Sequence, residues 1–197
     1  MNIGVISDIH SNYHGLKACV DHAILQGADR FLFLGDYVSD CAYPQKTMKL
    51  LYELKDSYEC SFIKGNREEY MLDHRDCIGA GWVMPSSATG SLLYTYEYYQ
   101  GNAQFGILHG ERGTWQEELL QIEYDKNQAA FELHESGLFE SASIWARIVE
   151  ICLLTGVDHS KECLELALFK YREREGKKEW TTLPEVYWQE AAAELGI

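Results

Sequence analysis

The sequence predicts an α/β fold, a layered sheet with helices on the outside, followed by a helical C-terminal extension. Three observations support this. Short apolar runs alternate with helical patterns over residues 1–66, which is typical of βαβ crossovers with parallel strands. A β-hairpin pattern occupies residues 103–124. From residue 126 onward, apolar residues recur with a helical period.

Turn and cap residues set the expected ends of these elements. The first run is apolar and short, as in a buried strand, and Gly27 is suited to end the helix that follows it. Pro44 suits the first turn of the second helix. We expect strands at 2–7, 30–35 and 60–64, helices at 12–26, 44–55 and 68–75, hairpin arms at 103–108 and 115–124, and further helices at 126–135, 142–154, 160–174 and up to residue 195.

Composition and charge argue against binding to nucleic acid or crossing a membrane, and they indicate a cellular compartment. The chain has 197 residues and a formal charge of −14, so a nucleic-acid surface, which needs a basic footprint, is disfavoured. No apolar run approaches the ~20 residues needed to cross a bilayer. The six cysteines lack a C-x-x-C pair and the sequence begins directly with a strand, which predicts a cytoplasmic protein without a signal peptide.

Candidate metal ligands stand at the ends of the three predicted parallel strands. Asp8 and His10 follow the first strand, and residues two apart on an extended chain point to the same side. Asp36 follows the second strand, and Asn66 follows the third. Ligands of open α/β sheets bind at this edge, so the spacing predicts a divalent-metal site. Asp-x-His also occurs by chance, and a doubly wound domain without metal is the competing interpretation.

These residues form three ordered motifs. Asp8-Ile9-His10, Gly35-Asp36 and Gly65-Asn66-Arg67-Glu68 resemble the first three motifs of the calcineurin-like metallophosphoesterases, in the small bacterial type. The resemblance implies a metallophosphoesterase-like layered sheet and a hydrolase that cleaves a phosphate monoester or diester with a metal-activated hydroxide. It also implies two divalent metal ions, with Mn²⁺ preferred and Fe, Ni, Zn or Mg as the other choices.

The resemblance assigns a role to each motif residue. Asp8 and His10 would hold the first metal, Asp36 would bridge the two metals, and Asn66 would give its amide oxygen to the second. Asp36 and Arg67 are the expected catalytic residues. The Arg67 guanidinium could hold phosphate oxygens bidentately, but it cannot act as a general acid near pH 7.

The later histidine motifs of the family are missing from this sequence. No Gly-His-x-His occurs, and the residues around 103–125 resemble strands that come after those motifs in the family. We therefore predict an internal loss near residues 97–103 and an incomplete second half-sheet. A deletion, a gene-model error and an omitted disordered segment all remain open as its origin. His109 precedes Gly110 and is a further candidate ligand; its alternative place is a hairpin without metal.

The expected organisation is a metallophosphoesterase-like core over residues 1–125 and a helical extension over 126–197. The amphipathic helices of the extension must bury a face against the core or against another subunit, so a homo-oligomer formed through this tail is one expectation. The expected substrate is a small phosphorylated molecule. The alternative function is a catalytically impaired family member that acts in binding or assembly.

Overall fold

A computed structural model describes residues 1–73, 101–176 and 183–197. Its centre is a five-stranded sheet with the order β3-β2-β1-β4-β5. The strands are β1 (Asn2–Ile6), β2 (Arg30–Phe33), β3 (Glu59–Phe62), β4 (Ala103–Glu111) and β5 (Thr114–Ile122). β1, β2 and β3 run parallel, and β4 and β5 join antiparallel. The predicted α/β fold and its parallel strands are confirmed.

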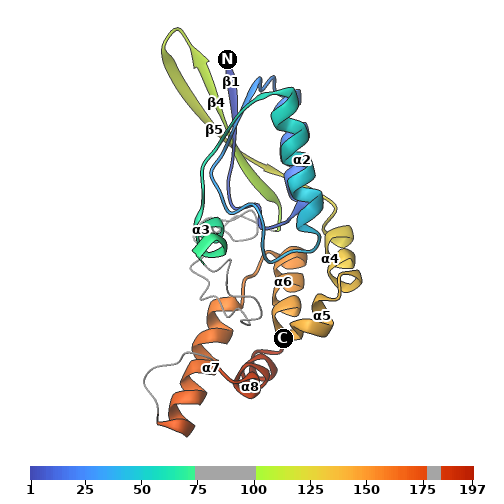
Figure 1. The fold of residues 1–197 in the computed structure, drawn as a ribbon, viewed down its shortest axis with the longest axis vertical. Coiled ribbons are helices and arrows are strands. Elements are labelled where there is room, and N and C mark those ends of the chain that lie inside the picture. The colour runs from blue at the N-terminus through green and yellow to red at the C-terminus, as the bar shows by residue number, and fades with distance from the viewer. Residues whose placement is uncertain (74–100, 177–182) are drawn as a thin grey trace.

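Two helices, α1 (Tyr13–Leu25) and α2 (Pro44–Ser57), connect the parallel strands and pack against the sheet (Figure 1). Alternate residues of the strands face these helices, as a period of two requires. Phe31 and Phe33 of β2 are fully buried in a core shared with Leu16 of α1 and Leu51 of α2. This core therefore packs against β1, β2 and β3, the strands that precede the candidate ligands.

Helices α4 (Lys126–Glu135), α5 (Leu138–Ser141), α6 (Ser143–Thr155), α7 (Ser160–Glu175) and α8 (Glu185–Leu195) form the C-terminal part. Figure 1 shows them beyond the end of the sheet that is opposite to the hairpin tip. They bury two further apolar clusters, one around Leu133 and Val149 and one around Cys163 and Ala167. Each cluster is distinct from the core beneath the sheet.

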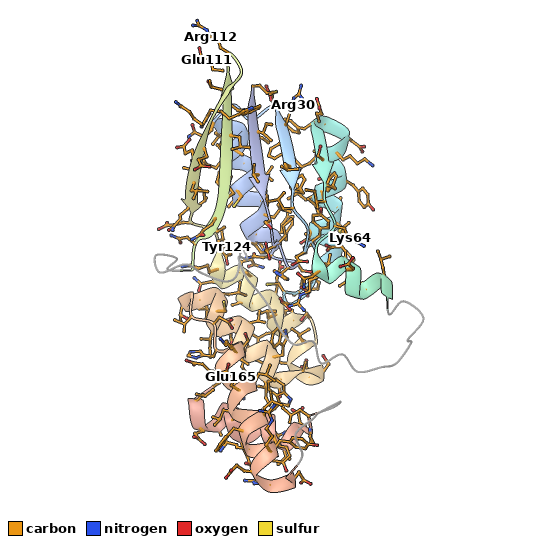
Figure 2. The ribbon with its side chains drawn as sticks, turned by 90° about the vertical axis from the view of Figure 1, so that its left-hand side faces the viewer. Arg30, Lys64, Glu111, Arg112, Tyr124 and Glu165 are labelled. Atoms are coloured by element: carbon orange, nitrogen blue, oxygen red, sulfur yellow. The ribbon has the colours of Figure 1, made fainter. Side chains whose placement is uncertain are left out.

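The helical part is joined to the sheet through Tyr124, which lies at the junction in Figure 2. The Asn12 side chain donates to the Tyr124 hydroxyl over 3.1 Å. It also accepts from the Gly15 backbone N–H over 3.0 Å and so caps α1. One buried asparagine thus connects the loop after β1 with the segment that leads into α4.

Several predicted elements differ from the observed ones. The first hairpin arm, β4, extends beyond the expected residue 108, because cross-strand pairing continues to Glu111↔Thr114. The second arm, β5, begins one residue earlier than expected and ends at Ile122. Helix α3 (Asn66–Asp73) begins two residues before the expected Glu68. The short α5 was not predicted. Most of the predicted loss near 97–103 lies outside the described residues, and the boundary at residue 125 stays a prediction.

None of the helices in the described ranges is long and apolar enough to span a membrane.

Candidate metal centre

The candidate site lies just beyond the ends of β1 and β2. The loops that follow these two strands remain hydrogen-bonded to each other through their backbones. The Asp8 N–H donates to the Gly35 carbonyl over 3.1 Å, and the His10 N–H donates to the Asp36 carbonyl over 2.9 Å. Two connecting loops thereby run side by side. The two candidate ligands from the first loop and the one from the second are brought to the same place by the main chain itself.

The backbone of this region is strained in the way that functional loops often are. Asp8, His10 and Asp36 all have positive φ, at 54°, 47° and 54°, a region that non-glycine residues seldom adopt. Gly65 packs so closely against Asp36 that an added Cβ would overlap its carboxylate. A side chain at position 65 would therefore push the two loops apart.

Asp8, His10 and Asp36 form a group with the composition of a metal site. Each offers one ligand atom, and these three atoms lie within 4.8 Å of one another. His10 and Asp36 are buried and Asp8 is partly buried. Two carboxylates and an imidazole suit Mn²⁺, Fe²⁺, Zn²⁺ and similar divalent ions, so the residues fit a metal of the kind that the sequence predicted.

The His10 ring is held on one side and faces Asp8 on the other. Its Nδ1 lies 2.5 Å from Ser39 Oγ and 3.1 Å from Asp40 Oδ2. Its Nε2 lies 3.7 Å from Asp8 Oδ1. A ligating histidine commonly contacts a carboxylate through its other ring nitrogen, and this arrangement matches that pattern.

Asp36 is influenced by burial and by its neighbours. Burial raises the pKa of the Asp36 carboxyl, and the Arg67 backbone N–H and the His10 ring act in the opposite direction. The Arg67 N–H donates to Asp36 Oδ1 over 2.7 Å. Asp8 and Glu68 add repulsion that raises the pKa further. A cation among these carboxylates would relieve that repulsion, because opposite charge favours the ionised form.

Glu68 holds the loops after β2 and β3 together. Its Oε2 accepts from the Asp36 and Gly65 backbone N–H groups over 2.8 and 2.9 Å, and its Oε1 accepts from the Tyr37 N–H over 2.8 Å. Three backbone donors that would otherwise need partners are therefore satisfied by one charged side chain. Asp36 is positioned from both sides as a result.

The third motif reaches the site through its backbone and through one buried side chain. Arg67 is buried, and its Nη2 lies 3.6 Å from Asp40 Oδ2. Asn66 is exposed at the first position of α3, between Gly65 and Arg67, which both contact Asp36. The structure thus places the predicted Arg67 beside the ligand group, with Asn66 next to it in the chain.

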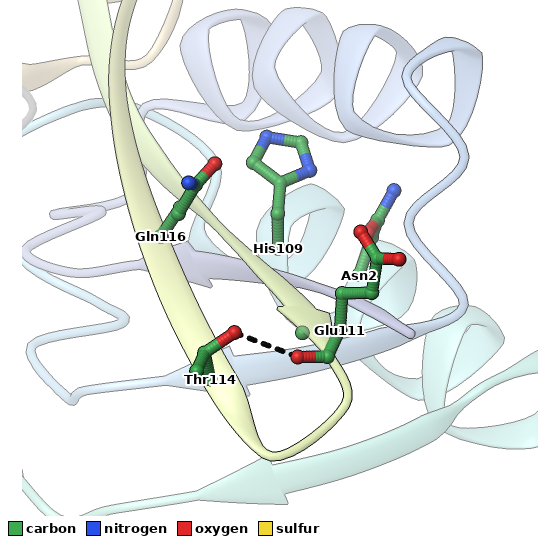
Figure 3. A pocket seen from close by; sticks show the side chains of 6 residues that line it. Asn2, His109, Glu111, Thr114 and Gln116 are labelled. Carbon is green, nitrogen blue, oxygen red and sulfur yellow. Dashed lines mark hydrogen bonds between the residues drawn. The ribbon is translucent and has the colours of Figure 1, made fainter.

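His109 lies at the other end of the sheet. It pairs with Asn2, at the start of β1, whereas Asp8 and His10 follow the end of that strand. Figure 3 shows it in a pocket of about 370 Å³ together with Asn2, Glu111, Thr114 and Gln116. Its Nε2 contacts Glu118 at 2.8 Å. The antiparallel direction of β4 therefore does not bring His109 to the ligand group.

Sequence reasoning missed Ser39, Asp40 and the bracing role of Glu68. Ser39 and Asp40 stand between Val38 and Cys41, in the segment between the second strand and Pro44. A carboxylate only four residues after Asp36 was the available signal. The close contact with His10 could not be read from that spacing, because it depends on a positive φ of 50° at Asp40.

Comparison with protein families gives a match to the calcineurin-like phosphoesterase family over residues 1–165. Among curated proteins, none matches. A metallophosphoesterase from Sphaerobacter thermophilus is similar in structure, with 14% identity, a TM-score of 0.53, and coverage of 80% of this chain and 99% of that one. A hypothetical protein from Pyrococcus horikoshii OT3 has 13% identity, a TM-score of 0.55 and the same coverages. At these identities the two structures demonstrate a shared fold.

Proposed function

The chain belongs to the calcineurin-like phosphoesterase family, and from this premise we propose that it hydrolyses small phosphate monoesters or diesters in a metal-dependent reaction. The observation that carries the proposal is the clustering of Asp8, His10 and Asp36 within 4.8 Å. A divalent metal bound there supplies Lewis acidity toward a phosphate oxygen and toward the attacking water. Mn²⁺ is the proposed ion, because the donor set combines carboxylate oxygens with one imidazole nitrogen.

The residues of the chain have separate tasks in this proposal. Asp8, His10 and Asp36 would hold one metal, and Asp36 with Asn66 would hold a second. Arg67 contributes a buried guanidinium beside Asp40, and its backbone N–H contacts Asp36. With a formal charge of −14 over the whole chain, an anionic substrate depends on such local positive charge and not on the general field.

Arg67 is proposed to orient the phosphate and to stabilise charge that develops on it. A guanidinium keeps its proton near pH 7, so it does not protonate the leaving group. We therefore expect a preference for esters with good leaving groups. Replacement by alanine should lower kcat/KM for p-nitrophenyl phosphate, and an Arg67→Ala enzyme as active as the wild type would contradict this role.

The test of the main proposal is hydrolysis of p-nitrophenyl phosphate and its diester with added Mn²⁺. Activity is expected in the wild type and not in Asp36→Asn, which keeps the shape of the side chain and removes its charge. His109→Gln is the matched control, because it alters a histidine at the other end of the sheet. Metal content measured by plasma mass spectrometry gives an independent answer.

A second candidate function is binding or assembly by a catalytically impaired family member, acting in the cytoplasm through the helical tail. It is favoured because the ligand-type group in the described parts of the chain has three members and because no Gly-His-x-His occurs in the sequence. Such a protein should hold almost no Mn²⁺ after desalting and hydrolyse neither ester. Analytical ultracentrifugation should then reveal an oligomer.

A further inference from the structure

Asp40 occupies a buried position between two residues of the candidate site. It lies between β2 and α2, and its side chain is 5% exposed. Its Oδ2 lies 3.1 Å from His10 Nδ1 and 3.6 Å from Arg67 Nη2. One carboxylate oxygen therefore lies near both His10, a proposed metal ligand, and Arg67, which is proposed to bind the phosphate.

Ser39 and Asp40 both lie close to the His10 Nδ1 atom, and they differ in the hydrogen bonds that they can form. The Ser39 hydroxyl at 2.5 Å can either donate or accept a hydrogen bond, so it is compatible with both neutral tautomers of the ring. An ionised carboxylate can only accept. The hydrogen bond of Nδ1 goes to Ser39, and the Asp40 carboxylate acts on this atom through its charge from 3.1 Å. That charge disfavours a lone pair on Nδ1 and favours an N–H there.

We propose that Asp40 is a positioning residue, whose carboxylate holds His10 in the Nδ1–H tautomer and holds Arg67 beside it. Nε2, which faces Asp8 at 3.7 Å, is then the ring atom that binds the metal. The inference rests on the proposed function, because it gives His10 a metal to bind. It adds a residue that lies outside the three motifs noted in the sequence.

The direct test is the tautomer of His10 in metal-free protein, read from ¹⁵N chemical shifts and two-bond ¹H–¹⁵N correlations. The spectrum is recorded about two pH units above the ordinary histidine pKa of about 6.5, and the His10→Gln spectrum identifies the signals. The wild type should show Nδ1–H. In Asp40→Asn and Asp40→Ala the Nε2–H form should appear, whereas Ser39→Ala should keep the wild-type pattern.

The second readout is Mn²⁺ affinity by calorimetry. Loss of such an outer contact lowers metal affinity by roughly 10- to 100-fold, and we expect a fall in that range for Asp40→Ala. Asp125→Ala is the stability control: it removes the cap of α4, so it should lower Tm and leave both the tautomer and the affinity unchanged.

Asp40→Ala leaves the buried Arg67 without this carboxylate, and the variant could fail to fold. Asp40→Asn keeps the size of the side chain, and the double variant Asp40→Ala/Arg67→Ala removes both charges of the pair; both should show the same tautomer change. An unchanged tautomer in the folded Asp40 variants, or a changed tautomer with unaltered Mn²⁺ affinity, overturns the inference. A wild type that binds no Mn²⁺ contradicts the proposed function, while the metal-free spectra still decide whether Asp40 holds the ring.

Discussion

Three of the histidine–carboxylate contacts among the described residues can be compared by the burial of their side chains. His10 and Asp40 have side chains that are 2% and 5% exposed, His14 and Glu132 are 20% and 12% exposed, and His109 and Glu118 are 36% and 48% exposed. The first lies at the ligand group, the second joins α1 to α4, and the third lies in the hairpin. A histidine paired with a carboxylate thus occurs in a candidate metal centre, a tertiary contact and a surface pair.

The comparison shows that environment decides what such a pair can do. Charges are weakly coupled where water reaches them and strongly coupled where it does not. At the ligand end of the sheet, Asp8 and Asp36 add further donor atoms to the pair. At the hairpin end, Glu118 contacts the His109 ring at the surface of the protein, so this pair contributes little to stability.

The largest contrast should come from removing the histidine at each end of the sheet. His10→Gln should reduce Mn²⁺ affinity by at least about 100-fold, since losing even an outer-shell partner costs 10- to 100-fold. Isothermal titration calorimetry measures the change. Equal losses in His10→Gln and His109→Gln would show that burial does not distinguish the two histidines.

Next in size should be the effect of Glu68, which braces the ligand end. Glu68→Ala removes the acceptor of three backbone N–H groups, and we expect unfolding to become about 2–4 kcal/mol easier. Urea unfolding measures this. The neighbouring Glu69 pairs with Lys64 at the surface, so Glu69→Ala should change stability by no more than about 0.5 kcal/mol. Comparable losses in the two variants would disprove the bracing role.

The contact between His14 and Glu132, which has intermediate burial, should affect how the stability of the protein depends on pH. Burial alone would raise the pKa of Glu132, but hydrogen bonds from Lys46 and Gln128 and the nearby His14 lower it overall. A lowered folded pKa stabilises the protein above the unfolded carboxyl value of about 4.3, and this contribution is lost as the pH falls through the folded value. The stability gap between wild type and Glu132→Gln should therefore be full at pH 7 and should shrink below about pH 4; a constant gap in urea unfolding contradicts this.

The smallest effect is expected at the hairpin. His109→Gln removes an exposed contact with Glu118, and surface pairs of this kind contribute about 0–1 kcal/mol. Thermal unfolding should detect little change, and Mn²⁺ affinity should equal that of the wild type. A marked fall in affinity would instead support the sequence-based candidacy of His109 as a ligand.

The sequence by itself determined the α/β fold and the edge of the sheet at which the ligands gather. Apolar periodicity located β1, β2 and β3, and parallel strands place their carboxyl ends together. The sequence alone therefore predicts Asp8, His10 and Asp36 as neighbours. The family match over residues 1–165 confirms the family resemblance, whereas the assignment of these three residues to a metal stays a prediction.

Only the tertiary structure determines which further residues contact Asp8, His10 and Asp36, and which candidates lie far from them. Asp40 reaches His10 because its backbone adopts a positive φ, and no pattern of residue types encodes that conformation. Glu68 reaches three backbone donors because two loops from different crossovers approach each other at Gly35 and Gly65. His109 is remote because β4 runs antiparallel to β1 in a register that opposes it to Asn2. Strand direction and loop conformation depend on contacts between distant segments, which local sequence does not specify.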